Sequence, residues 1–146
     1  MTLRLPKPLT KARFLLIGYG LILLIWMSLE DSSTLVVAIL GTGASIIYSG
    51  AWIGSRFGER DLALKNVSIG LIVWGALLGI VSSLITALLM FFKTSWHGHV
   101  YPDYPLAMIT DTLALMPIWA ISGGLLGLSF AIFLYLYHVN FTPLCR

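Results

Sequence analysis

Ionisable side chains are scarce in this chain of 146 residues. Charged residues make up 10% of the sequence, whereas a soluble domain carries about 25%. So few charges cannot cover the surface of a water-soluble fold. The chain is 58% hydrophobic and has a mean hydropathy of +0.93. This composition predicts an integral membrane protein whose main solvent is lipid.

Cysteine and catalytic motifs are nearly or wholly absent. The single cysteine, Cys145, excludes an internal disulfide framework and any CxxC metal or redox motif. The phosphate-binding GxxxxGK[ST] loop, the GxSxG elbow and the HExxH metal motif are missing, and no helix is expected to carry paired carboxylates. We therefore expect a protein that is not an enzyme, with no cofactor and no nucleic-acid partner.

What is present is a set of apolar stretches that suit membrane-spanning helices. We place four spans at residues 14–29, 35–54, 67–92 and 105–137. A helix of about 20 residues crosses a hydrocarbon core of about 30 Å. The prediction is an all-α, polytopic membrane protein with one four-helix domain over residues 14–138. A basic tail at 1–13 precedes it, an outer loop at 93–104 joins the last two spans, and a tail at 139–146 follows.

Pro117 interrupts the last of these stretches. Its ring removes a backbone N–H and clashes with the preceding turn, so a kink or break is expected near Leu113. The sequence leaves open whether residues 105–116 are interfacial, re-entrant or part of one long helix.

Basic residues lie almost entirely on one side of the predicted membrane. Eight of the nine lysines and arginines fall in the N-terminal tail, the second connection and the C-terminus, and the outer loop holds only Lys93. Because basic loops remain in the cytoplasm, we expect both termini to be cytoplasmic. The aromatic residues expected in belts at the two membrane interfaces are Trp26, Trp52, Trp96 and Tyr101.

Small residues recur at a spacing of four along the predicted helices. This spacing lets helix backbones approach closely in lipid. We predict helix packing at Gly41, Ser45, Gly50, Gly54, Gly75, Gly79, Gly123 and Gly127. The similar segments GALLG at 75–79 and GGLLG at 123–127 also fit an internal repeat, which many transporters contain. Two packing faces that meet each other would explain them equally well.

The outer loop contains the best candidate for a metal site. His97 and His99 are two residues apart, so both imidazoles point the same way if the segment is extended. Asp103 could add a carboxylate ligand. An ordinary solvated loop is the alternative. The same histidines, together with His138, could instead ligate the metal of a pigment, although none lies clearly within a predicted span.

Asp111 is the only acidic residue inside an apolar stretch. Intramembrane acids often belong to ion or proton paths. Counting about 20 residues back from Tyr137 starts the last span near Ile118, which leaves Asp111 roughly 10 Å outside the core. We therefore expect an interfacial carboxylate in contact with water or a partner, unless the segment is re-entrant.

These features predict a non-catalytic accessory, assembly or stabilising subunit of a larger membrane complex. The loops are too short for a separate domain, and the glycine-rich helix faces suit close packing. A competing hypothesis is a small oligomeric transporter or channel that uses Asp111 and the polar faces of the second and third helices. A third is a metal- or pigment-binding membrane protein that uses His97 and His99. The expected partners are the lipid bilayer, other membrane subunits or further copies of this chain.

Overall fold

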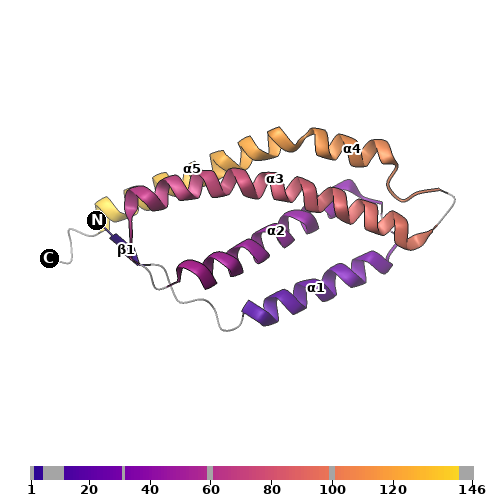
Figure 1. Cartoon of the computed structure of the whole chain (residues 1–146), viewed down its shortest axis with the longest axis horizontal. Helices are drawn as coiled ribbons and strands as arrows, with labels where there is room; N and C mark the ends of the chain where they lie inside the picture. The colour runs from indigo at the N-terminus through magenta and orange to yellow at the C-terminus, as the bar shows by residue number, and fades with distance from the viewer. Residues whose placement is uncertain (1, 5–11, 31, 59–60, 99–100, 142–146) are drawn as a thin grey trace.

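The computed structural model describes residues 2–4, 12–30, 32–58, 61–98 and 101–141. Within these ranges the chain consists of helices, short connecting segments and a two-stranded ribbon of three residues per strand (Figure 1). In chain order the elements are β1 (Thr2–Arg4), α1 (Ala12–Ser28), α2 (Thr34–Phe57), β2 (Asp61–Ala63), α3 (Leu64–His97), α4 (Leu106–Ala114) and α5 (Met116–Phe141).

In the described part of the chain, three helices are long and apolar enough to cross a membrane: α2, α3 and α5 over Met116–Tyr137. The chain is therefore a helical membrane protein, as its composition predicts. α1 is also apolar but has 17 residues, a length of about 25 Å at 1.5 Å per residue. That length falls short of a hydrocarbon core of about 30 Å, so the predicted span at residues 14–29 does not follow from length alone.

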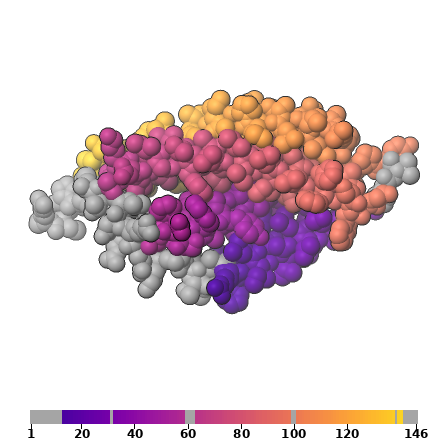
Figure 2. All heavy atoms as spheres, viewed as in Figure 1, coloured from indigo at the N-terminus to yellow at the C-terminus, as the bar shows by residue number. Residues whose placement is uncertain are grey.

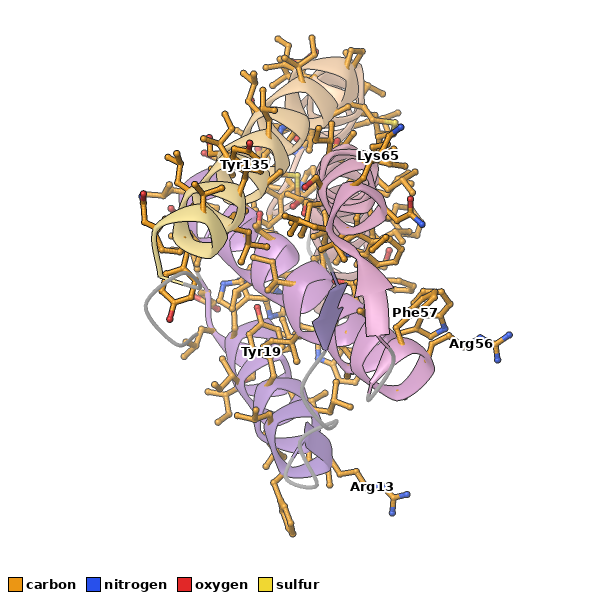
Figure 3. The ribbon with its side chains drawn as sticks, turned by 90° about the vertical axis from the view of Figure 1, so that its left-hand side faces the viewer. Arg13, Tyr19, Arg56, Phe57, Lys65 and Tyr135 are labelled. Carbon is orange, nitrogen blue, oxygen red and sulfur yellow. The ribbon has the colours of Figure 1, made fainter. Side chains whose placement is uncertain are left out.

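The helices form an open row with α3 in the middle. α5 packs along most of α3, α2 packs on another side of it, and α1 contacts α2 much less extensively. Figure 3, which looks down the helices, shows α1 at one edge of the row and α5 beside α3 at the other. The space-filling view shows the same order, with α4 and α5 along one side of α3 and α1 on the opposite side of the molecule (Figure 2).

The two ends of this row differ in character. β1 and β2 pair antiparallel at one end, with Thr2 opposite Ala63 and Arg4 opposite Asp61. α1 and α3 begin, and α2 ends, toward this side of the molecule (Figure 1), and these helix ends carry the exposed Arg13, Lys65 and Arg56. We call it the basic end. At the opposite end, which we call the loop end, α1 leads into α2 and α3 leads into α4 (Figure 1).

α3 has 34 residues and extends past the predicted span at 67–92 in both directions. It ends at His97 because Gly98 takes a left-handed backbone conformation, φ 58°, which glycine adopts without steric cost. The first five residues of the predicted outer loop are therefore helical. α2 and α5 also continue beyond their predicted ends, to Phe57 and Phe141.

α4 and α5 follow each other with only Leu115 between them. The Leu115 N–H donates to the carbonyl of Asp111 at 3.1 Å, and Pro117, which has no N–H, is the second residue of α5. The bend expected near Pro117 stays a prediction.

The buried core lies toward the loop end. It combines residues of α1, α2, α3, α4 and the segment before α4, namely Trp26, Val37, Ala87, Met90, Tyr104 and Ile109. Most large apolar side chains of the candidate spans are exposed. Exposed apolar side chains are what a lipid environment accommodates.

Candidate functional site

The loop end contains a buried lysine that contacts two groups of α1. Lys93, near the end of α3, is 0% exposed. Its Nζ lies 3.4 Å from the backbone carbonyl oxygen of Trp26 and 4.2 Å from the centroid of the Trp26 ring. The ring face attracts the ammonium group, and the carbonyl lies near the C-terminus of α1, where the helix dipole favours a cation. The prediction that Lys93 begins a solvated loop is therefore wrong.

Trp26 is correspondingly internal. Its side chain is 5% exposed and belongs to the core cluster, and its predicted position near a membrane interface stays a prediction. The ring is covered because it stacks over the buried Lys93. Trp52, Trp96 and Tyr101 are exposed, and their assignment to the belts stays a prediction.

Tyr104 connects the segment before α4 to two other helices. Its side chain is 1% exposed, and its hydroxyl donates to the carbonyl of Ser33, at the start of α2, at 3.3 Å. Its backbone N–H donates to the Thr94 hydroxyl of α3 at 3.1 Å. The Thr94 hydroxyl also lies 3.4 Å from the Tyr104 carbonyl oxygen, to which it donates. These bonds hold residues 101–105 against the ends of α2 and α3.

The structure brings together two of the three residues of the predicted metal site. The His97 Nδ1 and the Asp103 Oδ2 form an ion-pair contact between the end of α3 and the segment before α4. His99 lies outside the described residues. In the part of the chain that is described, no group of three or more histidine, cysteine, aspartate or glutamate residues could hold a metal ion. This pair links the end of α3 to the segment before α4. A metal ion bound at Nδ1 of His97 would have to displace Asp103.

Hydroxyl groups of α3, together with one of α2, form what we call the polar seam. Ser45, Ser82, Ser83 and Thr86 are all buried. Each donates to a backbone carbonyl: Ser45 to Gly41 at 2.9 Å, Ser82 to Leu78 at 2.7 Å, Ser83 to Thr112 at 2.8 Å, and Thr86 to Ser82 at 2.8 Å. Hydroxyls bonded in this way satisfy their hydrogen-bonding capacity without a ligand. The Ser83 bond also ties α3 to α4.

Asp111 and the polar seam face different directions. Asp111 is exposed on α4. The next residue, Thr112, turns toward α3: its carbonyl accepts from Ser83, and its hydroxyl lies 3.6 Å from the sulfur of Met90. The transporter hypothesis combines the Asp111 carboxylate with the polar seam. The carboxylate, however, is on the exposed surface of α4, whereas the seam contacts the surface of α4 that faces α3.

Glycines bring the backbones of α3 and α5 into direct contact. A methyl group added at Gly75 would overlap the carbonyl oxygen of Gly123, and one added at Gly123 would overlap that of Gly75. A methyl group at Gly79 would overlap the carbonyl of Trp119 in the same way. A methyl group at Gly127 would overlap the carbonyl of Leu71. The two segments singled out in the sequence therefore face each other.

The predicted packing positions of α2 behave differently from one another. A methyl group at Gly41 would overlap the side chain and backbone of Thr86 on α3, whereas the position that a Cβ of Gly50 would occupy has no described atom within 4 Å. Gly54 accepts a hydrogen bond from the Gly58 N–H at 3.1 Å. Gly41 thus lies in the contact with α3, and Gly50 is open.

Comparison with known proteins adds no identification. No protein-family model matches this chain, and neither the curated proteins nor the solved structures give a match. The function has to be inferred from the geometry of the chain itself.

Proposed function

We propose that the protein is a non-catalytic accessory subunit that assembles with, or stabilises, a larger membrane complex. The observation that carries this proposal is the exposure of α5. Only 11% of its candidate span is buried within the chain, although the helix is firmly attached to α3 along its glycine face. A rigid apolar helix with two uncovered flanks suits a contact with another membrane helix, where van der Waals packing supplies the affinity.

The uncovered flanks of α5 carry large apolar side chains. Ile121, Leu125 and Ile132 follow one another along one exposed stripe, and Phe130 and Phe133 lie on another. The glycines on the opposite face fix the distance of α5 from α3, so these side chains are presented on a fixed backbone. Little conformational freedom would be lost when a partner packs against them.

The interior supports the same proposal. The hydroxyls of the polar seam donate to carbonyl oxygens of the chain itself, and Asp111 lies on another surface. The transporter hypothesis needs a carboxylate and a polar path that act together. The connections between the helices are also short, which favours a role within the membrane over a separate soluble activity.

We further propose a four-span arrangement with both termini in the cytoplasm and a bend near Pro117. A span of about 25 Å fits a bilayer when flanking residues reach the interface or the bilayer thins locally. The exposed Arg13 at the start of α1 can extend to the interface in this way. The basic end, with Arg13, Arg56 and Lys65, would face the cytoplasm.

Site-specific photo-cross-linking tests the proposed subunit role. A photoreactive amino acid at Leu125 or Phe133 should yield one main product with a different membrane protein. The same label at Leu88, which is apolar and exposed but lies on α3, is the matched control and should yield much less of it. A product made of two copies of this chain would favour the oligomeric transporter instead. Adducts with lipid alone from all three positions would contradict the proposal.

A further inference from the structure

A groove lies between the last turns of α2 and the first half of α3. Its volume is about 480 Å³, and it is open on its outer side. Trp52, Ile53 and Phe57 line it from α2, and Val67, Leu71 and Trp74 line it from α3. It is thus almost entirely apolar and lies toward the basic end of the molecule.

Aromatic rings make one wall of the groove stiff. The rings of Trp52 and Trp74 stack with their centroids 5.6 Å apart and their planes 3° from parallel. Phe57 meets Trp52 edge to face at 6.3 Å. Offset-stacked and edge-to-face aromatic pairs are favourable geometries, so the wall is formed before any ligand arrives.

Gly70 leaves the space of the groove open. It lines the groove from α3, and no described atom lies within 4 Å of the position that its Cβ would occupy. A larger side chain at residue 70 would therefore enter the groove without meeting the backbone of a neighbouring helix. This gives the site a substitution that fills it and leaves the fold intact.

Polarity changes along the groove from one end to the other. Asn66, the one polar residue that lines it, stands eight residues before Trp74 on α3, a distance of about 12 Å along the helix axis. The exposed Arg56 precedes the lining residue Phe57, and the exposed Lys65 precedes Asn66. Figure 3 shows Arg56 and Phe57 together at the end of α2 and Lys65 at the start of α3. Asn66 thus lies at one end of an apolar groove, and the long side chains of Arg56 and Lys65 flank that end from α2 and α3 without lining it.

We propose that this groove binds one anionic phospholipid, with an acyl chain between α2 and α3 and the phosphate beside Arg56 and Lys65. The match is in charge as well as in shape. The exposed basic side chains complement an anionic head group, and the apolar lining complements the chain. Each lysine or arginine close to an anionic membrane surface strengthens binding about fivefold. Asn66 can donate from its amide to the phosphate or ester oxygens.

Native mass spectrometry of the full-length protein from mixed micelles measures this binding directly. The micelles contain equal amounts of phosphatidylglycerol and phosphatidylcholine. Wild-type protein should retain one phosphatidylglycerol in preference to phosphatidylcholine. Gly70→Leu should lower the retained lipid about tenfold, because roughly two methylene contacts of the chain are lost. Gly50→Leu, at an equally open glycine outside the groove lining, is the matched control and should bind as the wild type does.

The charge contribution is tested separately. Arg56→Gln together with Lys65→Gln should reduce the preference for phosphatidylglycerol about 25-fold, as two fivefold factors, while total lipid stays bound. Arg13→Gln removes an exposed cation on α1, away from Arg56 in Figure 3, and should leave the preference unchanged.

Added inorganic phosphate distinguishes a lipid site from a simple anion site. It should not displace the lipid at a millimolar concentration, since it cannot fill the apolar part of the groove. Displacement by phosphate would overturn the proposal. Equal lipid retention by Gly70→Leu and Gly50→Leu would overturn it too, as would equal retention of the two lipids by wild-type protein.

Discussion

The two sides of α3 are held by different kinds of contact. Toward α5, glycines bring backbone against backbone, and the carbonyl oxygens of Gly123 and Trp119 occupy the space that side chains would fill. Toward α1, at the loop end, the contact is polar, because Lys93 meets the carbonyl and the ring of Trp26. The glycine contact depends on residues that have no side chain, so it should not tolerate a larger residue. The lysine contact depends on a cation that meets a carbonyl oxygen and a ring face, so it should not tolerate the loss of the cation.

The largest effect is expected at the glycine contact. Gly79→Leu would place a side chain on the carbonyl of Trp119, so α3 and α5 would have to separate. We expect a loss of about 3 kcal/mol in the free energy of unfolding and a low yield of folded protein, measured by denaturation in mixed micelles. Gly50→Leu, where the space is open, is the control. Equal stability of the two variants would show that the glycine face does not hold the helices together.

Removal of the buried cation should have the next largest effect. Lys93→Ala loses the contacts with the carbonyl and ring of Trp26 and leaves a space, for an expected loss of about 2 kcal/mol. Lys93→Met keeps the volume and should lose about 1 kcal/mol, so the difference separates packing from charge. Lys65→Met, at an exposed lysine of the same helix, should leave the unfolding free energy unchanged. A more stable Lys93→Met variant would mean that burial of the charge outweighs its contacts.

A smaller effect is expected from a single hydroxyl. Tyr104→Phe removes the hydrogen bond to the carbonyl of Ser33 and should cost about 1 kcal/mol. The backbone bond to Thr94 remains, so the loss should be confined to the tether between residues 101–105 and α2. Faster amide exchange at Tyr104, with normal exchange in α5, would show this. Unchanged exchange would mean that the hydroxyl contributes nothing to the tether.

The smallest effect is expected at Asp111. The side chain is exposed, so Asp111→Asn should change stability by less than about 0.5 kcal/mol and should leave assembly with partners intact. Asp111→Leu should weaken assembly without changing any ion flux. Loss of a measurable ion current or uptake in Asp111→Asn, with assembly intact, would overturn the proposed function and favour the transporter.

The sequence predicts the helices better than it predicts their ends. Apolar composition identifies α2, α3 and α5 because length and hydropathy are local properties. A lone lysine after an apolar run normally meets water, so the sequence predicts that Lys93 lies in the loop. Its actual environment depends on Trp26, which is 67 residues away in the chain. No local pattern carries that information, so the sequence does not predict that α3 continues to His97 or that Lys93 is buried.

The candidate sites likewise include features that the sequence predicts and features that depend on the tertiary structure. Spacing identifies the glycines that lie between α3 and α5, because helical periodicity puts residues four apart on one face. It does not reveal that Gly50 is open, since that depends on which helix lies opposite. The sequence predicts His97 and Asp103 as two of the three ligands of one metal ion. Their direct contact arises from the turn at Gly98, whose left-handed backbone the sequence alone did not fix.

The ribbon of β1 and β2 has a consequence for how many times the chain can cross a bilayer. Two strands joined by hydrogen bonds must lie on the same side of the membrane, so the chain between Arg4 and Asp61 makes an even number of crossings. α2 lies in that interval and supplies one of them if it spans. A second crossing must then come from the same interval, and α1 is the other apolar helix described there. Parity therefore favours α1 as a spanning helix, in spite of its 17 residues, and supports the proposed four-span arrangement independently of its length.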